Sequence, residues 1–419
     1  MERKYQQNNL CLFDKAIIVF LFLALGVSAL SYISEDSSVA RVGGPMFSFI
    51  AAAVVVIRYG VSSLLKISVF GVLLLPYLIC RLSLQIYECG FDVPTISFAL
   101  LIVVVMSFLI VGGTYGIKAG YLSFSAFAIV ASVIALCYLR KIVAMASSER
   151  FTLDGGHPNL VGYLCLANAC VGLSFLFHRS GWVRILGGGI YLLNVLLMFF
   201  SESRGNLAAV LVATFSVAGL WLWKSGRSGL GKLALRIMLL FLLLAILLLV
   251  AMAGKHEILD YLVDKLQIFS EGRGIDSGGS GRIVQWEYVL SKLDVVTFLL
   301  GMGYRLSDLT YDAIDNSYIV LLLELGFIVP TLVVVWMSVR VWQAASAQKA
   351  MPGQSLYCAE VFSFSVLIGC GVSCFFCRYL IAVGNPVSLV MLLILCSTSA
   401  TQTLLRNAFN KGKNTIQEL

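Results

Sequence analysis

"MLLFLLLAILLLVAMAG", from Met238 to Gly254, contains neither a charged nor a polar side chain. The stretch is close to the ~20 residues with which an apolar helix crosses the hydrocarbon core of a bilayer. Each backbone N–H and C=O group inside lipid needs a partner within its own segment, and an α-helix supplies those partners. The stretch therefore predicts a membrane-spanning helix, and comparable apolar runs recur on both sides of it.

The composition of the whole chain agrees with this interpretation. Of the 419 residues, 59% are hydrophobic and 12% are charged, and the mean hydropathy is +0.93. Soluble domains are typically about 25% charged. The first apolar run follows Lys15 and has no small-residue cleavage site, so we do not expect a removable signal peptide. The sequence predicts an all-α, polytopic integral membrane protein with a single membrane domain over residues 1–419.

Hydropathy divides the chain into about twelve predicted spans. They cover residues 16–33, 44–59, 67–86, 95–113, 121–139, 158–177, 183–201, 205–223, 237–254, 317–339, 356–376 and 380–403. An even number of spans puts both termini on one side, and seventeen of the 30 Lys and Arg residues fall on that side. Six of the other thirteen lie in one long loop, residues 255–316, which the positive-inside rule discounts. We therefore expect cytoplasmic termini and interpret the net charge of +8 as a topology signal.

The long outer loop, 255–316, is expected to carry short helices of its own. "HEILDYLVDKLQIF" (256–269) and "RIVQWEYVLSKL" (282–293) each place apolar residues on one helical face. The stretch between them, "SEGRGIDSGGSGR" (270–282), is rich in glycine, which is typical of a flexible connection.

The cysteines and histidines do not form a metal-binding pattern. Most of the 11 cysteines lie in apolar runs, where cysteine acts as a small hydrophobic residue. The pair in "CFFC", Cys374 and Cys377, has no second cysteine pair or histidine near it in the sequence. The three histidines are widely separated. We therefore expect neither a metal site nor a cofactor.

Four polar clusters fall at the outer side of the predicted topology. They are "DGGHPNLVGY" (154–163), "SESRGN" (201–206), "GGSGRIVQW" (278–286) and "YDAIDNSYIVLLLELG" (311–326). The candidate site residues within them are His157, Asn159, Glu202, Arg204, Gly281, Arg282, Asp315, Asn316, Tyr318 and Glu324. The clusters are far apart in sequence but share one predicted membrane surface, so we expect them to form one site.

Most of these residues also have a simpler structural interpretation. Asn159 can start a helix, and Asp315 or Asn316 can cap one, which is worth about 1 kcal/mol. Arg204 can extend from the interface towards water. Arg282 can be a solvated loop charge. These alternatives stay open on the sequence alone.

Together, however, the clusters indicate anion chemistry. A glycine-rich loop that leads into a helix N-terminus, combined with arginines, binds phosphate through backbone N–H groups and bidentate guanidinium contacts. A nearby acid can then act as a general base. Glu324 lies two turns into a predicted span, where an ionisable group is a functional candidate, and a buried pair with an arginine is its structural alternative.

The four clusters resemble those of the O-antigen ligase and polymerase family of bacterial envelope enzymes. The matching elements are "HPN", "SRG", "SGR" with Trp four residues later, and "DNSYIVLLLELG", in that order over residues 150–330. The resemblance implies an all-helical, metal-independent transferase of the bacterial inner membrane. Such enzymes move a glycan from undecaprenyl pyrophosphate to an acceptor hydroxyl at the periplasmic face. Arg204 and Arg282 would then stabilise the leaving phosphates, and Asp315 would be the base or orient the acceptor.

The residue before the asparagine of the fourth element separates two activities. Ligases of the family have histidine there and deliver the glycan to lipid A–core, whereas this chain has Asp315. The difference favours a polymerase of glycan repeat units, with Asp312 and Glu202 as alternative bases. A transporter or flippase of the lipid-linked sugar is the alternative from another class. Expected partners are the undecaprenyl-pyrophosphate-linked glycan, the lipid bilayer, a chain-length-determining copolymerase and a flippase, but no nucleic acid.

Overall fold

The computed structural model describes residues 11–32, 38–66, 68–139, 142, 158–225, 282–310, 314–347, 355–378 and 380–397. Within these ranges the regular structure is helical and includes no β-strand, so the predicted all-α class is confirmed for the described part. The apolar run 238–254 and the predicted loop helix 256–269 lie outside these ranges. The second predicted loop helix is present as α12 (Arg282–Ser291).

The described helices form two sets along the chain, one before and one after residues 226–281, which lie outside the described part. The first set is α1 (Leu12–Ser28), α2 (Ser38–Tyr59), α3 (Val69–Cys89), α4 (Val93–Tyr115), α5 (Ile117–Cys137), α7 (Pro158–Phe175), α8 (Gly181–Phe200) and α9 (Arg204–Ser225). The second set is α12, α13 (Val295–Leu300), α14 (Ser307–Thr310), α15 (Ser317–Leu325), α16 (Ile328–Ala347), α17 (Ser355–Ser373) and α18 (Pro386–Cys396). Two short 3-10 helices, η1 (Ala29–Tyr32) and η2 (Val61–Lys66), follow α1 and α2.

Eight of the described helices are long and apolar enough to cross a membrane. They are α2 from Arg41 onwards, α3, α4, α5, α7, α8, α9 as far as Trp221, and α16. The helices α1, α17 from Tyr357 onwards, and α18 are apolar but shorter, and within the described part of the predicted span 380–403 the helical residues are the 11 of α18. This pattern agrees with a multi-pass membrane protein, although the described helices do not establish the predicted count of twelve spans.

The predicted span 317–339 is not one helix but two. The helix α15 ends after nine residues at Gly326, whose φ of +69° lies in the left-handed region, and α16 begins at Ile328. A Cβ on Gly326 would collide with the Leu299 carbonyl at the end of α13. The break therefore arises because another segment of the chain lies against the helix at this point, which hydropathy does not reveal.

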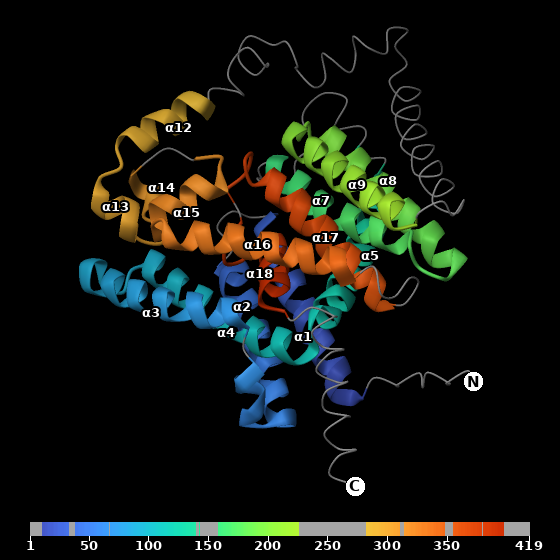
Figure 1. Ribbon diagram of the computed structural model, residues 1–419, viewed down its shortest axis with the longest axis horizontal. Helices are drawn as coiled ribbons and strands as arrows, with labels where there is room; N and C mark the ends of the chain where they lie inside the picture. The colour runs from blue at the N-terminus through green and yellow to red at the C-terminus, as the bar shows by residue number, and fades with distance from the viewer. Residues whose placement is uncertain are drawn as a thin grey trace.

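The buried centre of the protein is formed by α7, α17 and α18. All 11 residues of α18 are buried, and α7 is buried over most of its length. The helix α7 packs against α8, α9 and α17, while α18 packs against α4 and α5. Figure 1 shows α16 and α17 crossing the middle of the molecule, with α12 and α13 at one end of the long axis and α8 and α9 towards the other. Contacts of α13 with α15, α15 with α16, α16 with α17, and α17 with α9 connect the two ends.

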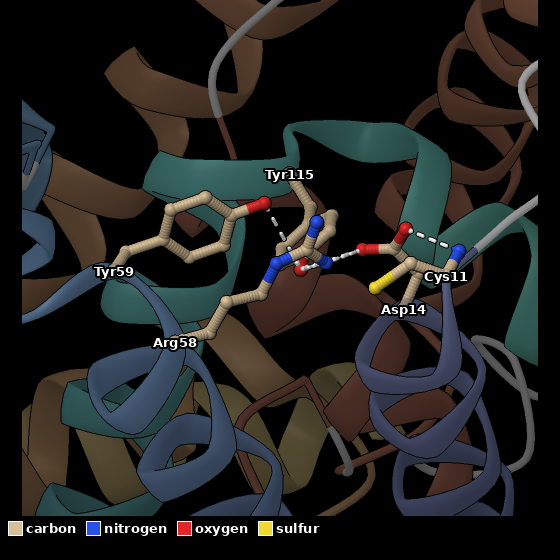
Figure 2. A network of polar contacts seen from close by, with 5 residues as sticks. All are labelled: Cys11, Asp14, Arg58, Tyr59 and Tyr115. Atoms are coloured by element: carbon tan, nitrogen blue, oxygen red, sulfur yellow. Dashed lines mark hydrogen bonds and ion pairs between the residues drawn. The ribbon is translucent and has the colours of Figure 1, made fainter.

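A polar network ties together one end each of α1, α2 and α4 (Figure 2). Arg58 forms an ion pair with Asp14, and the Tyr115 hydroxyl donates a hydrogen bond to the same carboxylate over 2.8 Å. Burial alone would raise the pKa of Asp14, but the hydrogen bonds from Tyr115, the Cys11 N–H and Arg58 outweigh it, and the pKa is lowered. The start of α1 and the ends of α2 and α4 therefore lie on one face, as alternating helix directions require.

Candidate active site

The turn between α8 and α9, "SESRGN", lies against the start of α7. Asn206 is buried, and its Nδ2 donates to the Asn159 carbonyl oxygen over 3.2 Å and to Ser203 Oγ over 2.7 Å. Gly162 on α7 permits this approach, because a Cβ there would collide with the Ser203 side chain. The first and second polar clusters are therefore in direct contact, as expected from the sequence.

The same turn contains strained backbone. Glu202 has a φ of +52°, a conformation that costs an L-residue roughly 1–2 kcal/mol. The Ser203 N–H closes the turn by donating to the Met198 carbonyl oxygen over 3.1 Å. Arg204, the first residue of α9, lies half-buried immediately after the strained position. Strain of this kind is concentrated at functional sites, which makes this turn a candidate for one.

The C-terminal end of α17 connects this turn to α15. Ser373 Oγ donates to Asn206 Oδ1 over 2.5 Å. The Ser317 N–H donates to the carbonyl oxygen of the next residue, Cys374, over 2.8 Å, and Ser317 Oγ donates to the Cys377 carbonyl oxygen over 2.6 Å. The end of α17 and the "CFFC" segment that follows it thus link the second and fourth clusters, through Ser373 on one side and the Cys374 and Cys377 carbonyl oxygens on the other.

Asp315 and Asn316 have separate roles at the start of α15. Asn316 is the N-cap, because its side-chain oxygen accepts hydrogen bonds from the backbone N–H groups of Tyr318 (3.0 Å) and Ile319 (3.2 Å). Asp315 instead pairs with Arg282, with 2.9 Å between Oδ2 and Nη2. The two side chains are 29% and 24% exposed, so water and a ligand can reach them. The structure thereby brings the third and fourth clusters together.

A small apolar core holds α12 in position for this ion pair. Val289 of α12 packs with Ile314, Val320 and Leu323 on the α15 side. Trp286, one helical turn after Arg282, is packed against the same group. Burial of these side chains fixes the face of α12 that carries Arg282 towards α15. The contact joins residues that are about thirty positions apart in the sequence.

Glu324 and Tyr318 are held by hydrogen bonds to other segments of the fold. Glu324 is 4% exposed and accepts a hydrogen bond from Ser307 Oγ over 2.6 Å. The arginine beside it is Arg305, which contributes a backbone hydrogen bond and a charge interaction. The Tyr318 hydroxyl donates to the Gly371 carbonyl oxygen over 2.8 Å, and its ring packs against Phe375. Both residues therefore support the position of α15 from within the fold.

Three residues named in the sequence analysis, His157, Gly281 and Asp312, lie outside the described part of the chain. Within the described part, no group of three or more His, Cys, Asp or Glu side chains is arranged to hold a metal ion. Among the candidate residues that the structure describes, Arg282, Asp315, Glu202 and Arg204 are partly exposed and can meet a ligand, as can the start of α7.

The sequence did not identify Ser317 and Ser373 as parts of the site. Both are small polar residues, at 1% exposure, and each lies beside an apolar helical run where serine usually bonds to its own helix. The available signal was indirect: Ser317 directly follows the capping asparagine, and Ser373 directly precedes "CFFC". Their bonds to other segments are what join the clusters.

The assembled site offers cationic groups and carboxylates at one surface. A guanidinium group can bind a phosphate oxygen pair in bidentate fashion, and a carboxylate can accept a proton from a hydroxyl group. Arg282 and Asp315 supply one of each at hydrogen-bonding distance. This combination suits the transfer of a group from a phosphorylated donor to an alcohol.

No protein-family model matches this chain, and no curated protein matches it either. The function is therefore inferred from residue chemistry, geometry and the resemblance of the four motifs.

Proposed function

We propose that this protein is a polysaccharide polymerase of the bacterial inner membrane. Its donor is a growing glycan on undecaprenyl pyrophosphate, and its acceptor is a hydroxyl group of a new repeat unit on the same type of carrier. The observation that carries the proposal is the 2.9 Å pair of Arg282 and Asp315, which joins two motifs of the resemblance. The apolar helices suited to a membrane are consistent with substrates that are themselves lipid-anchored.

The reaction follows from the roles of these two groups. The acceptor hydroxyl loses its proton to Asp315 as its oxygen attacks the anomeric carbon of the donor sugar. The bond from that carbon to the pyrophosphate oxygen breaks, and undecaprenyl pyrophosphate leaves with the bonding electrons. Arg282 and Arg204 stabilise the negative charge that develops on the leaving phosphates. Attack opposite the leaving group inverts the configuration at the anomeric carbon.

The ion pair also explains how the base becomes available. A partly exposed pair contributes only about 0–1 kcal/mol, so a better partner can separate it. A pyrophosphate presents several anionic oxygens to Arg282 and competes for the guanidinium group. Donor binding then frees the Asp315 carboxylate next to the incoming hydroxyl. The base is uncovered when the donor is present.

Chain extension by the purified protein tests the proposal. The protein in nanodiscs is supplied with lipid-linked repeat units extracted from a strain that lacks it, and product length is followed on gels. We expect a ladder of products from the wild-type protein and none from Arg282→Lys, because lysine cannot form the bidentate contact. A wild-type protein that leaves the repeat units at their original length would overturn the proposal.

A ligase is the nearest alternative, because the same site chemistry serves any acceptor hydroxyl. The lipopolysaccharide of a deletion strain separates the two activities. Loss of a polymerase leaves lipid A–core with a single repeat unit, whereas loss of a ligase leaves bare core. Asp315 at the position where the family's ligases have histidine favours the first outcome.

A transporter of the lipid-linked sugar is supported by a separate observation. Arg340 of α16 and Glu360 of α17 are each 1% exposed, and both lie in apolar helices. The buried Arg340 donates a hydrogen bond to the Gln343 side-chain oxygen over 2.9 Å. Buried ionisable residues within membranes are typical of transport pathways. Transport of the lipid-linked repeat unit across the membrane of sealed vesicles, without lengthening of its glycan, would favour this alternative.

A further inference from the structure

Three polar side chains on one face of α3 form hydrogen bonds to the two irregular segments around Gly301 and Gly326. Tyr77, Arg81 and Gln85 are spaced four residues apart, so they lie above one another along the helix. The rest of the helix is largely apolar, with Leu74 and Leu78 buried in the core. A polar row of this kind within an apolar helix needs partners inside the protein.

Backbone groups supply the hydrogen bonds of this row, and Arg81 Nη1 in addition lies 3.6 Å from the Glu88 carboxylate. Arg81 is 3% exposed; its Nε donates to the Leu300 carbonyl oxygen over 2.9 Å and its Nη2 to the Gly301 carbonyl oxygen over 3.0 Å. The Tyr77 hydroxyl donates to the Leu325 carbonyl oxygen over 2.7 Å.

Gln85 completes the row through both ends of its amide. Its Nε2 donates to the Tyr304 carbonyl oxygen over 3.2 Å, and its Oε1 accepts from the Tyr304 N–H over 2.8 Å. The α3 row therefore bonds to two segments, 300–304 and the end of α15.

These two segments also bind one another. The Met302 N–H donates to the Leu323 carbonyl oxygen over 2.7 Å, and the Gly303 N–H donates to the Glu324 carbonyl oxygen over 3.0 Å. Gly301, with a φ of +76°, has no room for a Cβ because the Glu324 backbone lies against it. Residues 300–304 thus cross the end of α15 in close backbone contact. At this crossing α3 forms hydrogen bonds to both segments.

The crossing lies at a depth where such contacts matter. At 1.5 Å per residue, Arg81 lies about 12 Å from the Cys89 end of α3 and about 18 Å from the Val69 end. If α3 crosses the bilayer, these carbonyl groups lie within its hydrocarbon core. Irregular backbone is tolerated there only when its polar groups are satisfied by protein. Arg81 satisfies two of them at once.

The crossing is connected to both halves of the candidate site. The segment 300–304 follows α13, which is joined to α12 and hence to Arg282 through residues 292–294. On its other side, α15 runs from the crossing to Asp315 over nine residues, about 13 Å. The α3 row therefore holds the part of the fold to which the segments carrying Arg282 and Asp315 are both attached.

We propose that Arg81, assisted by Tyr77 and Gln85, is a positioning residue for the transfer reaction. It acts through the crossing and does not touch the substrate; it sets the angle and depth of α15 and so the geometry of the Arg282–Asp315 pair. The proposal rests on the proposed function, because its effect is measured on that reaction. A displacement of about 1 Å at a reacting group can cost about a hundredfold in rate.

Three variants and one control test this role in full-length protein in nanodiscs. Arg81→Met removes every donor and keeps the length of the side chain, Arg81→Lys keeps the charge without the fork, and Tyr77→Phe removes a single hydrogen bond. Ser83→Ala is the matched control on the same helix, because the Ser83 hydroxyl bonds only to the Ile79 carbonyl of its own helix over 3.0 Å. The measurements are kcat and KM for chain extension, and hydrogen exchange of peptides covering 298–306 and 317–327.

We expect kcat to fall about a hundredfold in Arg81→Met, less in Arg81→Lys and less again in Tyr77→Phe, with KM within about twofold of wild type. Hydrogen exchange should rise in 298–306 and 317–327 and stay unchanged in α7 and α18. Unchanged kcat in Arg81→Lys and Tyr77→Phe, or faster exchange spread over the whole protein, would overturn the positioning role. A wild-type protein that does not extend chains would instead refute the proposed function, so the two failures are distinguishable.

Discussion

Replacement of Asp315 by Asn is expected to slow chain extension by about 10²–10⁴-fold and to leave the fold nearly intact. Replacement of its neighbour Asn316 by Ala is expected to weaken the fold. The difference follows from the start of α15, where Asn316 caps the helix and Asp315 pairs with Arg282. The two variants thereby separate the chemical role from the structural role at adjacent positions.

The magnitudes come from these contacts. Two unit charges 2.9 Å apart attract by about 1.4 kcal/mol at the dielectric constant of water, and ordering of the side chains reduces a partly exposed pair to about 0–1 kcal/mol. Asp315→Asn should therefore lower the free energy of unfolding by at most about 1 kcal/mol. Loss of a general base lowers the rate by about 10²–10⁴-fold. Asn316→Ala removes the acceptor of two backbone N–H groups and should cost about 1–2 kcal/mol.

The assay combines the rate of repeat-unit addition in nanodiscs with thermal unfolding of the same preparations. Asp294→Asn is the matched control. Asp294 caps α13 by accepting from the Thr297 N–H over 2.7 Å, and asparagine caps about as well. This control removes one carboxylate from the same loop and should change neither rate nor stability. Asn316→Ser is the stability control, because serine also caps a helix.

Two results would refute this reasoning. If Asp315→Asn adds repeat units at the wild-type rate, Asp315 is not the base, and Glu202 becomes the next candidate within the described residues. If Asp315→Asn unfolds at as low a temperature as Asn316→Ala, the ion pair is a structural element rather than a displaceable one.

Three further predictions concern the rest of the molecule. Gly326→Ala should destabilise the protein by about 2 kcal/mol or more, because alanine is strained at this positive φ and its Cβ would collide with the backbone of α13. Gly219→Ala, at an open helical position, should be neutral or slightly stabilising. The melting temperatures of the two variants test this difference. The pKa of Asp14 is lowered below 3.8, so its ionised side chain stabilises the fold above about pH 4 and this contribution is lost as the pH falls further. Asp14→Asn should therefore flatten the decline in melting temperature between about pH 5 and pH 3. In intact cells stripped of outer membrane, a membrane-impermeant thiol reagent should label the exposed Cys89 and reach the exposed Cys11 only after the membrane is opened, and the reverse pattern would contradict the predicted orientation.

The boundaries of the helices show which structural features a sequence pattern can predict. The starts of α4 and α7 agree with the predicted spans within a few residues, because Asp92 with Pro94 and Pro158 are local start signals. The break at Gly326 could not be predicted in this way. Gly162, Gly172 and Gly219 lie inside continuous helices, so glycine by itself does not mark a helix end. What differs at Gly326 is the backbone of α13 lying against it.

Hydropathy and the four polar motifs by themselves determined an all-helical chain with long apolar helices and a short list of candidate residues. Both are local properties: a run of apolar side chains requires a helix in lipid wherever it occurs, and a polar group at its edge needs a partner. Only the tertiary structure decided which partners are used. It assigned the cap to Asn316 and the ion pair to Asp315, joined the clusters through Ser317 and Ser373, and bound Arg81 to the backbone beyond α13. These contacts join residues tens to hundreds of positions apart, and they depend on how helices pack rather than on any spacing in the sequence.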